Sequence, residues 1–314
     1  MGGGDMTGFV QKIRAAAKGR LRAGALALAG LLAACSHTDI GPTFTEDVHR
    51  LDPATFECCF DPEKFYPAPA IELALGLANS LGPAVSRGAY GQYEDTAYPG
   101  KLTGKTEAHA AIVADLKPLD LLLIGNTSYP LGRLVPGRFS HTLVYLGTEA
   151  QLRAAGLWNL PEVKPYHEAI RAGQIIAETA APATRLRTPA KAFEADRVLA
   201  LRPALSPEER VLAARRLFAS VGVPINYTLG IKDAEGRFSC TGLAEYAMPG
   251  LGLRHRVVYG QEVIMPDDIA AQAIRGERLR VVSYTVGTDS GFERHSVFAL
   301  MVHIAAFWGV PGAR

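Results

Sequence analysis

The stretch RFSHTLVYLG, residues 138–147, places His141 inside a run in which apolar and polar residues alternate loosely before a glycine. Such alternation predicts a β-strand. The apolar run DLLLIG at 120–125 precedes it and has the length and flanks of a second, buried strand. His141 is therefore expected on a strand of a sheet, at a position where an apolar residue would serve packing.

Patterns on both sides of these strands predict an α+β chain. Ser206 precedes a proline and two acids and is the expected N-cap of a helix that ends at Gly222. The tail at 292–310 is apolar and is expected to be a core or interface helix rather than a membrane span. Helices are expected at 70–81, 105–116, 206–222 and 266–276, a loop at 87–104, and further strands at 173–179, 183–188, 195–203 and 277–287.

The first 34 residues have the pattern of a secretory signal. Five basic residues precede the apolar run AGALALAGLLAA at 23–34, which is too short for a stable membrane span. The run ends in LAAC, which resembles the bacterial lipobox, whose cysteine, here Cys35, is lipidated and becomes the first residue of the mature chain. Ser36 follows, so the resemblance implies a lipid anchor on the periplasmic face of the outer membrane. A plain signal peptide with an incidental Cys35 is the alternative.

Removal of this segment changes the charge of the chain. The full sequence of 314 residues carries a formal +2, but the segment takes five basic residues and one acid with it, which leaves −2. No basic cluster follows Cys35, so we expect no nucleic-acid partner. The remaining length suffices for one sizeable core with additions.

The cysteine count leaves one thiol over. Besides Cys35, the chain has the adjacent Cys58 and Cys59 in FECCF and a lone Cys240. The adjacent pair has three alternatives: a disulfide with each other, bonds to a second chain, or burial in the reduced form. No C-x-x-C or H-E-x-x-H spacing accompanies the pair, so we expect no metal and no cofactor. An odd count in an oxidising compartment makes Cys240 the expected free thiol.

Cys240 lies in RFSCTGLAEYA at 237–247, where a loop is expected to enter a helix capped by Ser239 or a neighbour. Cysteine is nucleophilic as the thiolate, and a helix N-terminus or an imidazolium lowers its pKa. His141 is the candidate imidazole, and Glu178, at the end of the next strand, is the candidate acceptor that orients it. We therefore predict a catalytic group of Cys240, His141 and Glu178. Each residue alone is also compatible with a structural role.

In this order, the motifs resemble the permuted NlpC/P60 proteins, the papain-like fold of the YiiX/YaeF type. That family has a GD-I-L strand, then FSHVGIYLG, a strand ending in IEA, and F-CSELV; the match covers about residues 117–285. The resemblance implies a circularly permuted papain-like fold, with an antiparallel sheet packed on helices and helical N- and C-terminal additions. His141, Glu178 and Cys240 match its catalytic residues, and Asp120 matches the aspartate of the GD turn. Substrate contacts are implied for Ser140, Asn226 and Tyr227.

The chain departs from the family at three places. Leu119 stands before Asp120 in place of glycine, Gly242 replaces the glutamate of CSELV, and Thr142 and Leu143 follow the histidine in place of valine and glycine. The expected segments are a signal peptide at 1–34, a tether at 35–68, a helical cap region at 69–116, the permuted papain-like catalytic domain at 117–287 and an apolar helix at 288–314.

Two hypotheses of different classes follow. The first is a lipid-anchored, periplasm-facing cysteine hydrolase that cleaves an amide, ester or thioester in a peptidoglycan peptide or a lipid-type substrate. We expect such a protein to contact the membrane through Cys35 and to be monomeric. The second is an inactive papain-like lipoprotein that serves as a binding or envelope-assembly module, which Gly242 and the unmatched flanks favour. A redox module at Cys58 and Cys59 lacks a thioredoxin-like pattern, and no GxSxG motif supports a serine hydrolase.

Overall fold

The computed structural model describes residues 51–89, 98–128, 135–231, 233 and 235–309. These residues all belong to one compact unit, Phe44–Arg314. The predicted signal segment at 1–34, the predicted lipidation site Cys35 and the first half of the predicted tether lie outside the described residues.

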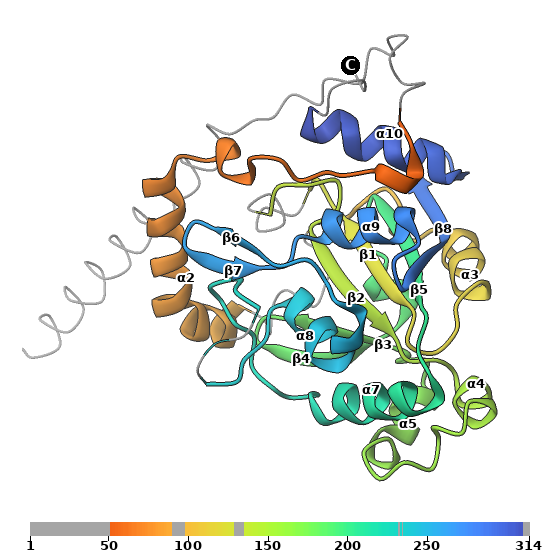
Figure 1. Ribbon diagram of the computed structural model, residues 1–314. Helices are drawn as coiled ribbons and strands as arrows, with labels where there is room; N and C mark the ends of the chain where they lie inside the picture. The colour runs from red at the N-terminus through yellow and green to blue at the C-terminus, as the bar shows by residue number, and fades with distance from the viewer. Residues whose placement is uncertain (1–50, 90–97, 129–134, 232, 234, 310–314) are drawn as a thin grey trace, which may run out of the picture. The chain divides into compact units, whose positions relative to one another are not determined.

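The main element is a seven-stranded antiparallel sheet (Figure 1). Its strand order is β4-β3-β2-β1-β5-β8-β9, and each neighbouring pair is antiparallel. The predicted α+β class with a large antiparallel sheet is confirmed, and so are the six predicted strands. The strands are β1 (Leu121–Gly125), β2 (His141–Tyr145), β3 (Ile176–Ala180), β4 (Ala183–Arg187), β5 (Arg197–Pro203), β8 (Leu279–Gly287) and β9 (Phe292–His295).

Strand β1, at the middle of the sheet, is apolar on both faces, and both faces are buried. Leu121, Leu122 and Leu123 of β1 are all fully buried, and they pair with β2 on one side and β5 on the other. Burial of a leucine side chain contributes about 1.5–3 kcal/mol each. A continuous apolar run is therefore what this position in the sheet requires.

The helices pack against this sheet and against one another. Helix α8 lies against β2 and β3, α7 packs on α8, α9 on β5 and β8, and α10 on α9 and β8 (Figure 1). The helices are α2 (Ala68–Ala89), α3 (Thr106–Ala114), α4 (Glu149–Ala154), α5 (His167–Arg171), α6 (Pro189–Ala192), α7 (Pro207–Ala219), α8 (Cys240–Ala247), α9 (Pro266–Arg275) and α10 (Val297–Trp308). Short 3₁₀ turns are η2 (Pro53–Thr55), η3 (Pro62–Phe65), η5 (Lys164–Tyr166) and η6 (Pro249–Leu251).

The predicted start of α7 is confirmed in detail. The Ser206 side chain accepts a hydrogen bond from Glu209 N, and the Glu209 carboxylate accepts one from Ser206 N. This reciprocal capping box satisfies two backbone donors that have no acceptor within the helix.

The structure corrects two predicted boundaries and adds a hairpin. Residues 292–295 form strand β9 and not the start of the predicted C-terminal helix, which begins at Val297 because the Ser296 side chain caps it through Ala299 N. The hairpin of β6 (Arg256–Val258) and β7 (Gln261–Val263) was not predicted. Helix α2 continues to residue 89, well past the predicted end at 81.

Both flanks of the predicted catalytic domain pack against it. On the N-terminal side, Arg275 of α9 donates to the Phe56 carbonyl, and Tyr259 donates to the Tyr66 carbonyl. On the C-terminal side, Trp308 of α10 is almost wholly buried. None of the helices in the described part of the chain has the length and apolar character required to cross a membrane.

Candidate active site

Cys240 is the first residue of α8, and the local sequence explains why the helix begins there. Ser239 has extended backbone, and its hydroxyl accepts a hydrogen bond from Gly242 N at 3.1 Å. The Cys240 thiol therefore sits in the first turn, next to backbone N–H groups that have no acceptor in the helix. It is a free, partly exposed thiol, as the cysteine count predicted.

The register of the sheet places His141 and Glu178 on one face. Glu178 of β3 is opposite Leu143 of β2, and side chains two residues apart on a strand point to the same side. His141 is therefore a diagonal neighbour of Glu178, at a spacing that long side chains can bridge. The His141 Nε2 atom lies 3.4 Å from Glu178 Oε1, and this buried nitrogen has no hydrogen-bond partner among the described residues. Contacts of this length are common in unliganded catalytic sites.

Helix α8 packs against β2, so the Cys240 thiol lies near the His141 side chain and each group shifts the pKa of the other. Burial opposes ionisation of the thiol, but the His141 charge and hydrogen bond outweigh it and lower the thiol pKa. Burial also opposes protonation of His141, but Cys240 and Glu178 together raise the His141 pKa to about 10. Both shifts favour a thiolate beside an imidazolium over the neutral pair.

Two backbone donors add to this effect. The backbone N–H groups of Thr142 and Thr241 lie near the Cys240 sulfur and favour the thiolate. Thr142 N–H is available because β3 pairs with β2 only from Leu143 to Tyr145. The sulfur thus lies where β2 and β3 stop pairing and α8 begins.

Two arginines that sequence reasoning did not single out complete the surroundings of Glu178. Arg185 Nε lies 3.0 Å from Glu178 Oε2, and Arg187 Nε lies 3.2 Å from the same oxygen. Burial would raise the Glu178 pKa, but His141 and the two arginines lower it to about 2. The sequence ATRLRT indicates that Arg185 and Arg187 share one face of a strand. It does not indicate that this face meets Glu178, because that depends on the β3–β4 register, in which Arg185 is opposite Glu178.

Gly242 occupies a position that accepts no side chain. A Cβ atom at this residue would lie 1.8 Å from the Ile231 carbonyl oxygen, which is closer than any real contact. Ile231 N in turn donates to Glu262 O, which ties this loop to the β6–β7 hairpin. The loop that precedes α8 therefore crosses the helix where the resembling family has a glutamate.

The three predicted substrate-binding residues occupy different environments. Ser140 is partly buried directly before His141, and Tyr227 is also partly buried, near Arg237. Asn226 is only 1% exposed: its amide donates to Gly230 O and accepts from the N–H and hydroxyl of Thr228. Asn226 thus fixes the loop conformation, and the structure gives it no exposed surface for a substrate.

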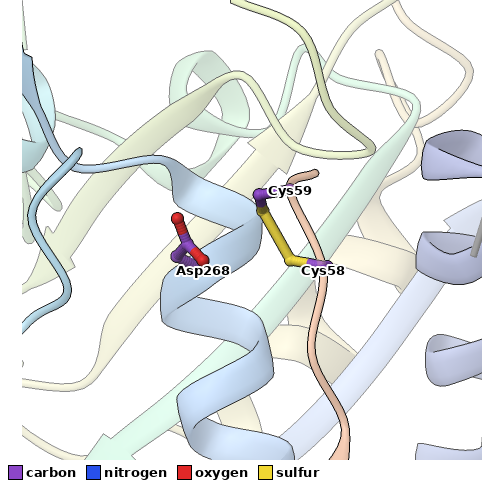
Figure 2. Close-up of side chains that lie close together, drawn as sticks. All are labelled: Cys58, Cys59 and Asp268. Carbon is purple, nitrogen blue, oxygen red and sulfur yellow. A yellow bond between two sulfur atoms is a disulfide. The ribbon is translucent and has the colours of Figure 1, made fainter. Parts of the chain in front are cut away.

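The adjacent cysteines form a different centre. Cys58 and Cys59 are disulfide-bonded to each other and lie beside Asp268 of α9 (Figure 2). These three side chains are close enough for a metal site, but the sulfurs are joined, and Arg256 donates to both oxygens of Asp268. The carboxylate charge is already neutralised, so this arrangement fits an anchored N-terminal segment better than a metal centre.

Comparisons with protein-family models, with curated proteins and with solved structures found no match to this chain.

Proposed function

We propose that this chain is a cysteine hydrolase that cleaves an amide, ester or thioester. The observation that carries the proposal is the placement of Cys240 at the start of α8, which packs on the strand that begins at His141, with the thiol pKa lowered and the imidazole pKa raised to about 10. A buried structural cysteine has neither a cationic partner nor a lowered pKa. Perturbed pairs of this kind are concentrated in catalytic sites.

The proposed reaction has two steps, acylation of Cys240 and hydrolysis of the acyl-enzyme, and His141 transfers a proton in each. The Cys240 thiolate attacks the carbonyl carbon, and His141 gives its proton to the leaving nitrogen, oxygen or sulfur as the acyl bond breaks. Water then attacks the thioester carbonyl, and His141 takes a proton from this water. The carbon–sulfur bond breaks, which releases the acid product and restores the Cys240 thiolate. Glu178 holds the imidazole, and the Cys240 N–H is a donor for the oxyanion, a contribution of roughly 3–4 kcal/mol for such a group.

A permuted papain-like fold is part of this proposal. The histidine strand precedes the cysteine helix in the chain, and α8 packs on the sheet beside that strand. Leu119, which stands in place of the family glycine before Asp120, has a left-handed backbone with φ 75°, the conformation that favours glycine. The Asp120 carboxylate is buried and paired with Arg202, so its role here is structural.

The cellular setting is proposed from the sequence. The lipobox pattern at Cys35 favours a monomer anchored by lipid to the periplasmic face of the outer membrane, where peptidoglycan peptides and lipids are the available acyl compounds. No nucleic acid, metal or cofactor takes part in the proposed reaction.

The test is the rate of iodoacetamide alkylation of Cys240 against pH, in a Cys35→Ser background and with the label located by peptide mass spectrometry. We expect rapid labelling to persist well below pH 8 and to fall about 100-fold at pH 6 in His141→Ala, because an ordinary thiol is barely ionised there. Arg215→Ala, an exposed change on α7, is the matched control. Slow labelling that rises only near pH 8.5 and ignores His141 would overturn the proposal and favour a binding module.

A further inference from the structure

The C-terminal helix α10 has no part in the proposed chemistry, yet it reaches the segment that precedes His141. The Trp308 indole Nε1 donates a hydrogen bond to Asp267 Oδ2 at 2.8 Å. Both residues are buried, with exposed fractions of 1% and 0%. Asp267 lies in the first turn of α9, so α9 and α10 meet at this bond.

The same carboxylate holds the backbone that leads into β2. Arg138 N donates to Asp267 Oδ2 at 2.7 Å, and Phe139 N donates to Oδ1 at 2.8 Å. At Gly137 the chain passes so close that an added Cβ would lie 3.0 Å from Oδ2. Three donors from two separate elements thus converge on one buried carboxylate.

We propose that Asp267 is a positioning residue for His141, and that α10 is a working part of the active site because Trp308 fixes Asp267. The proposal rests on the proposed function, since it concerns how His141 is held against Cys240. Phe139 is two residues before His141, so a change in the 138–139 backbone moves the start of β2.

The charge of Asp267 suits this role. Its two oxygens receive only donors, which is the pattern of an ionised carboxylate. Burial raises the Asp267 pKa to about 6, against the hydrogen bonds from Arg138, Trp308 and Phe139, and the neighbouring Asp268 charge adds to the rise. The Asp267 carboxylate is therefore ionised at neutral pH. In Asp267→Asn an N–H₂ group replaces one of the two oxygens, so at least one of the three N–H donors loses its acceptor.

Asp268 provides a matched control. It is the next residue in the same turn, is also buried, and lies beside Cys58 (Figure 2). Its carboxylate pairs with Arg256 rather than with the segment before β2. Asp267→Asn and Asp268→Asn therefore make the same chemical change in the same turn. Only Asp267→Asn removes an acceptor of the backbone N–H groups that precede His141.

The experiment is the alkylation profile of Cys240 in both variants, with thermal unfolding measured in parallel. In Asp267→Asn we expect the apparent thiol pKa to rise by about one unit and the rate at pH 6 to fall about tenfold, because displacement of a catalytic group by a fraction of an ångström weakens its contacts. Asp268→Asn is expected to keep the wild-type profile even though it lowers the melting temperature. Equal profiles in Asp267→Asn and wild type, or equal losses in both variants, overturn the proposal.

A second variant, Trp308→Phe, tests the same proposal if Asp267→Asn does not fold. Trp308→Phe removes the indole N–H and keeps a smaller aromatic ring at this position, and we expect it to slow labelling at pH 6 about two- to fivefold. If Asp267→Asn does not fold and Trp308→Phe labels like wild type, the positioning role is rejected. An ordinary thiol pKa in the wild type itself, unchanged by His141→Ala, is the distinct result that rejects the proposed function and this inference with it.

Discussion

Two cysteine centres in this chain contain the same kinds of groups and have opposite properties. At Cys58 and Cys59, the sulfurs are bonded to each other, and the adjacent Asp268 is paired with Arg256. At Cys240, the thiol is free and faces a cation, His141. The comparison shows that a cysteine is chemically available where its sulfur is unbonded, partly exposed and next to a cation.

The charges at the two centres are also arranged differently. The Arg256–Asp268 pair is closed on itself, with two hydrogen bonds between one cation and one anion. Glu178 instead lies within ion-pair distance of His141 and of two arginines. One anion shared by three cations leaves a positive balance beside the thiol, which supports its ionisation.

The largest contrast is expected in thiol reactivity after mild reduction of the native protein. At pH 6 we expect Cys240 to label with iodoacetamide at least about 100-fold faster than Cys58 or Cys59, because those two are buried beside a carboxylate and have no facing imidazole. Labelling in denaturant is the control and should be uniform. Equal native rates would remove the distinction between the two centres.

The next contrast concerns stability. Arg256→Ala leaves the buried Asp268 carboxylate without its cation, and we expect a loss of about 3–5 kcal/mol in the free energy of unfolding, measured with urea. Reactivity of Cys240 should not change. A double variant with Asp268→Leu should lose much less than the sum of the single changes, and additive losses would argue against a paired role.

A smaller effect is expected from Glu178→Gln. Loss of the carboxylate removes one of the groups that raise the His141 pKa, so we expect about a tenfold slower reaction of Cys240 at pH 6. The Glu178 pKa is about 2 in the fold and lies below its ordinary value near 4.5. The stability it contributes is therefore full above pH 4.5 and is lost as the pH falls toward 2. Urea titrations at pH 6 and pH 3 should show a smaller acid loss in the variant than in the wild type.

The smallest effect is expected from Ser239→Ala, which removes the N-cap of α8. We expect a loss of about 1 kcal/mol in the free energy of unfolding and a modest rise in the thiol pKa, because the first turn loosens. Ser239→Asp, which keeps the cap, should restore stability. Full wild-type stability in Ser239→Ala would show that packing alone holds this turn.

The sequence was sufficient for the elements that carry strong local patterns. The apolar run of β1 and the Ser206 cap of α7 are decided by neighbouring residues, and His141, Glu178 and Cys240 were picked out by their order along the strands and helix. Strand β9 was missed because FERH is short and continues into an apolar helix, so that only pairing with β8 makes it a strand. Arg185, Arg187 and Asp267 were missed because their roles depend on register and on contacts between distant segments.

The adjacency of Cys58 and Cys59 has a consequence for how the chain matures. A bond between neighbouring residues encloses no intervening chain, so it can form before any tertiary structure and requires no loop closure. Residues 141 and 240, by contrast, meet only after the sheet and α8 have assembled, which is a slow class of contact. In an oxidising compartment, early closure of the neighbouring pair leaves Cys240 as the one free thiol of the described residues, and burial of the pair on folding keeps its sulfurs from thiolate attack. The nascent chain then reaches its final assembly with the Cys240 thiol protected from mispairing within the described part of the molecule.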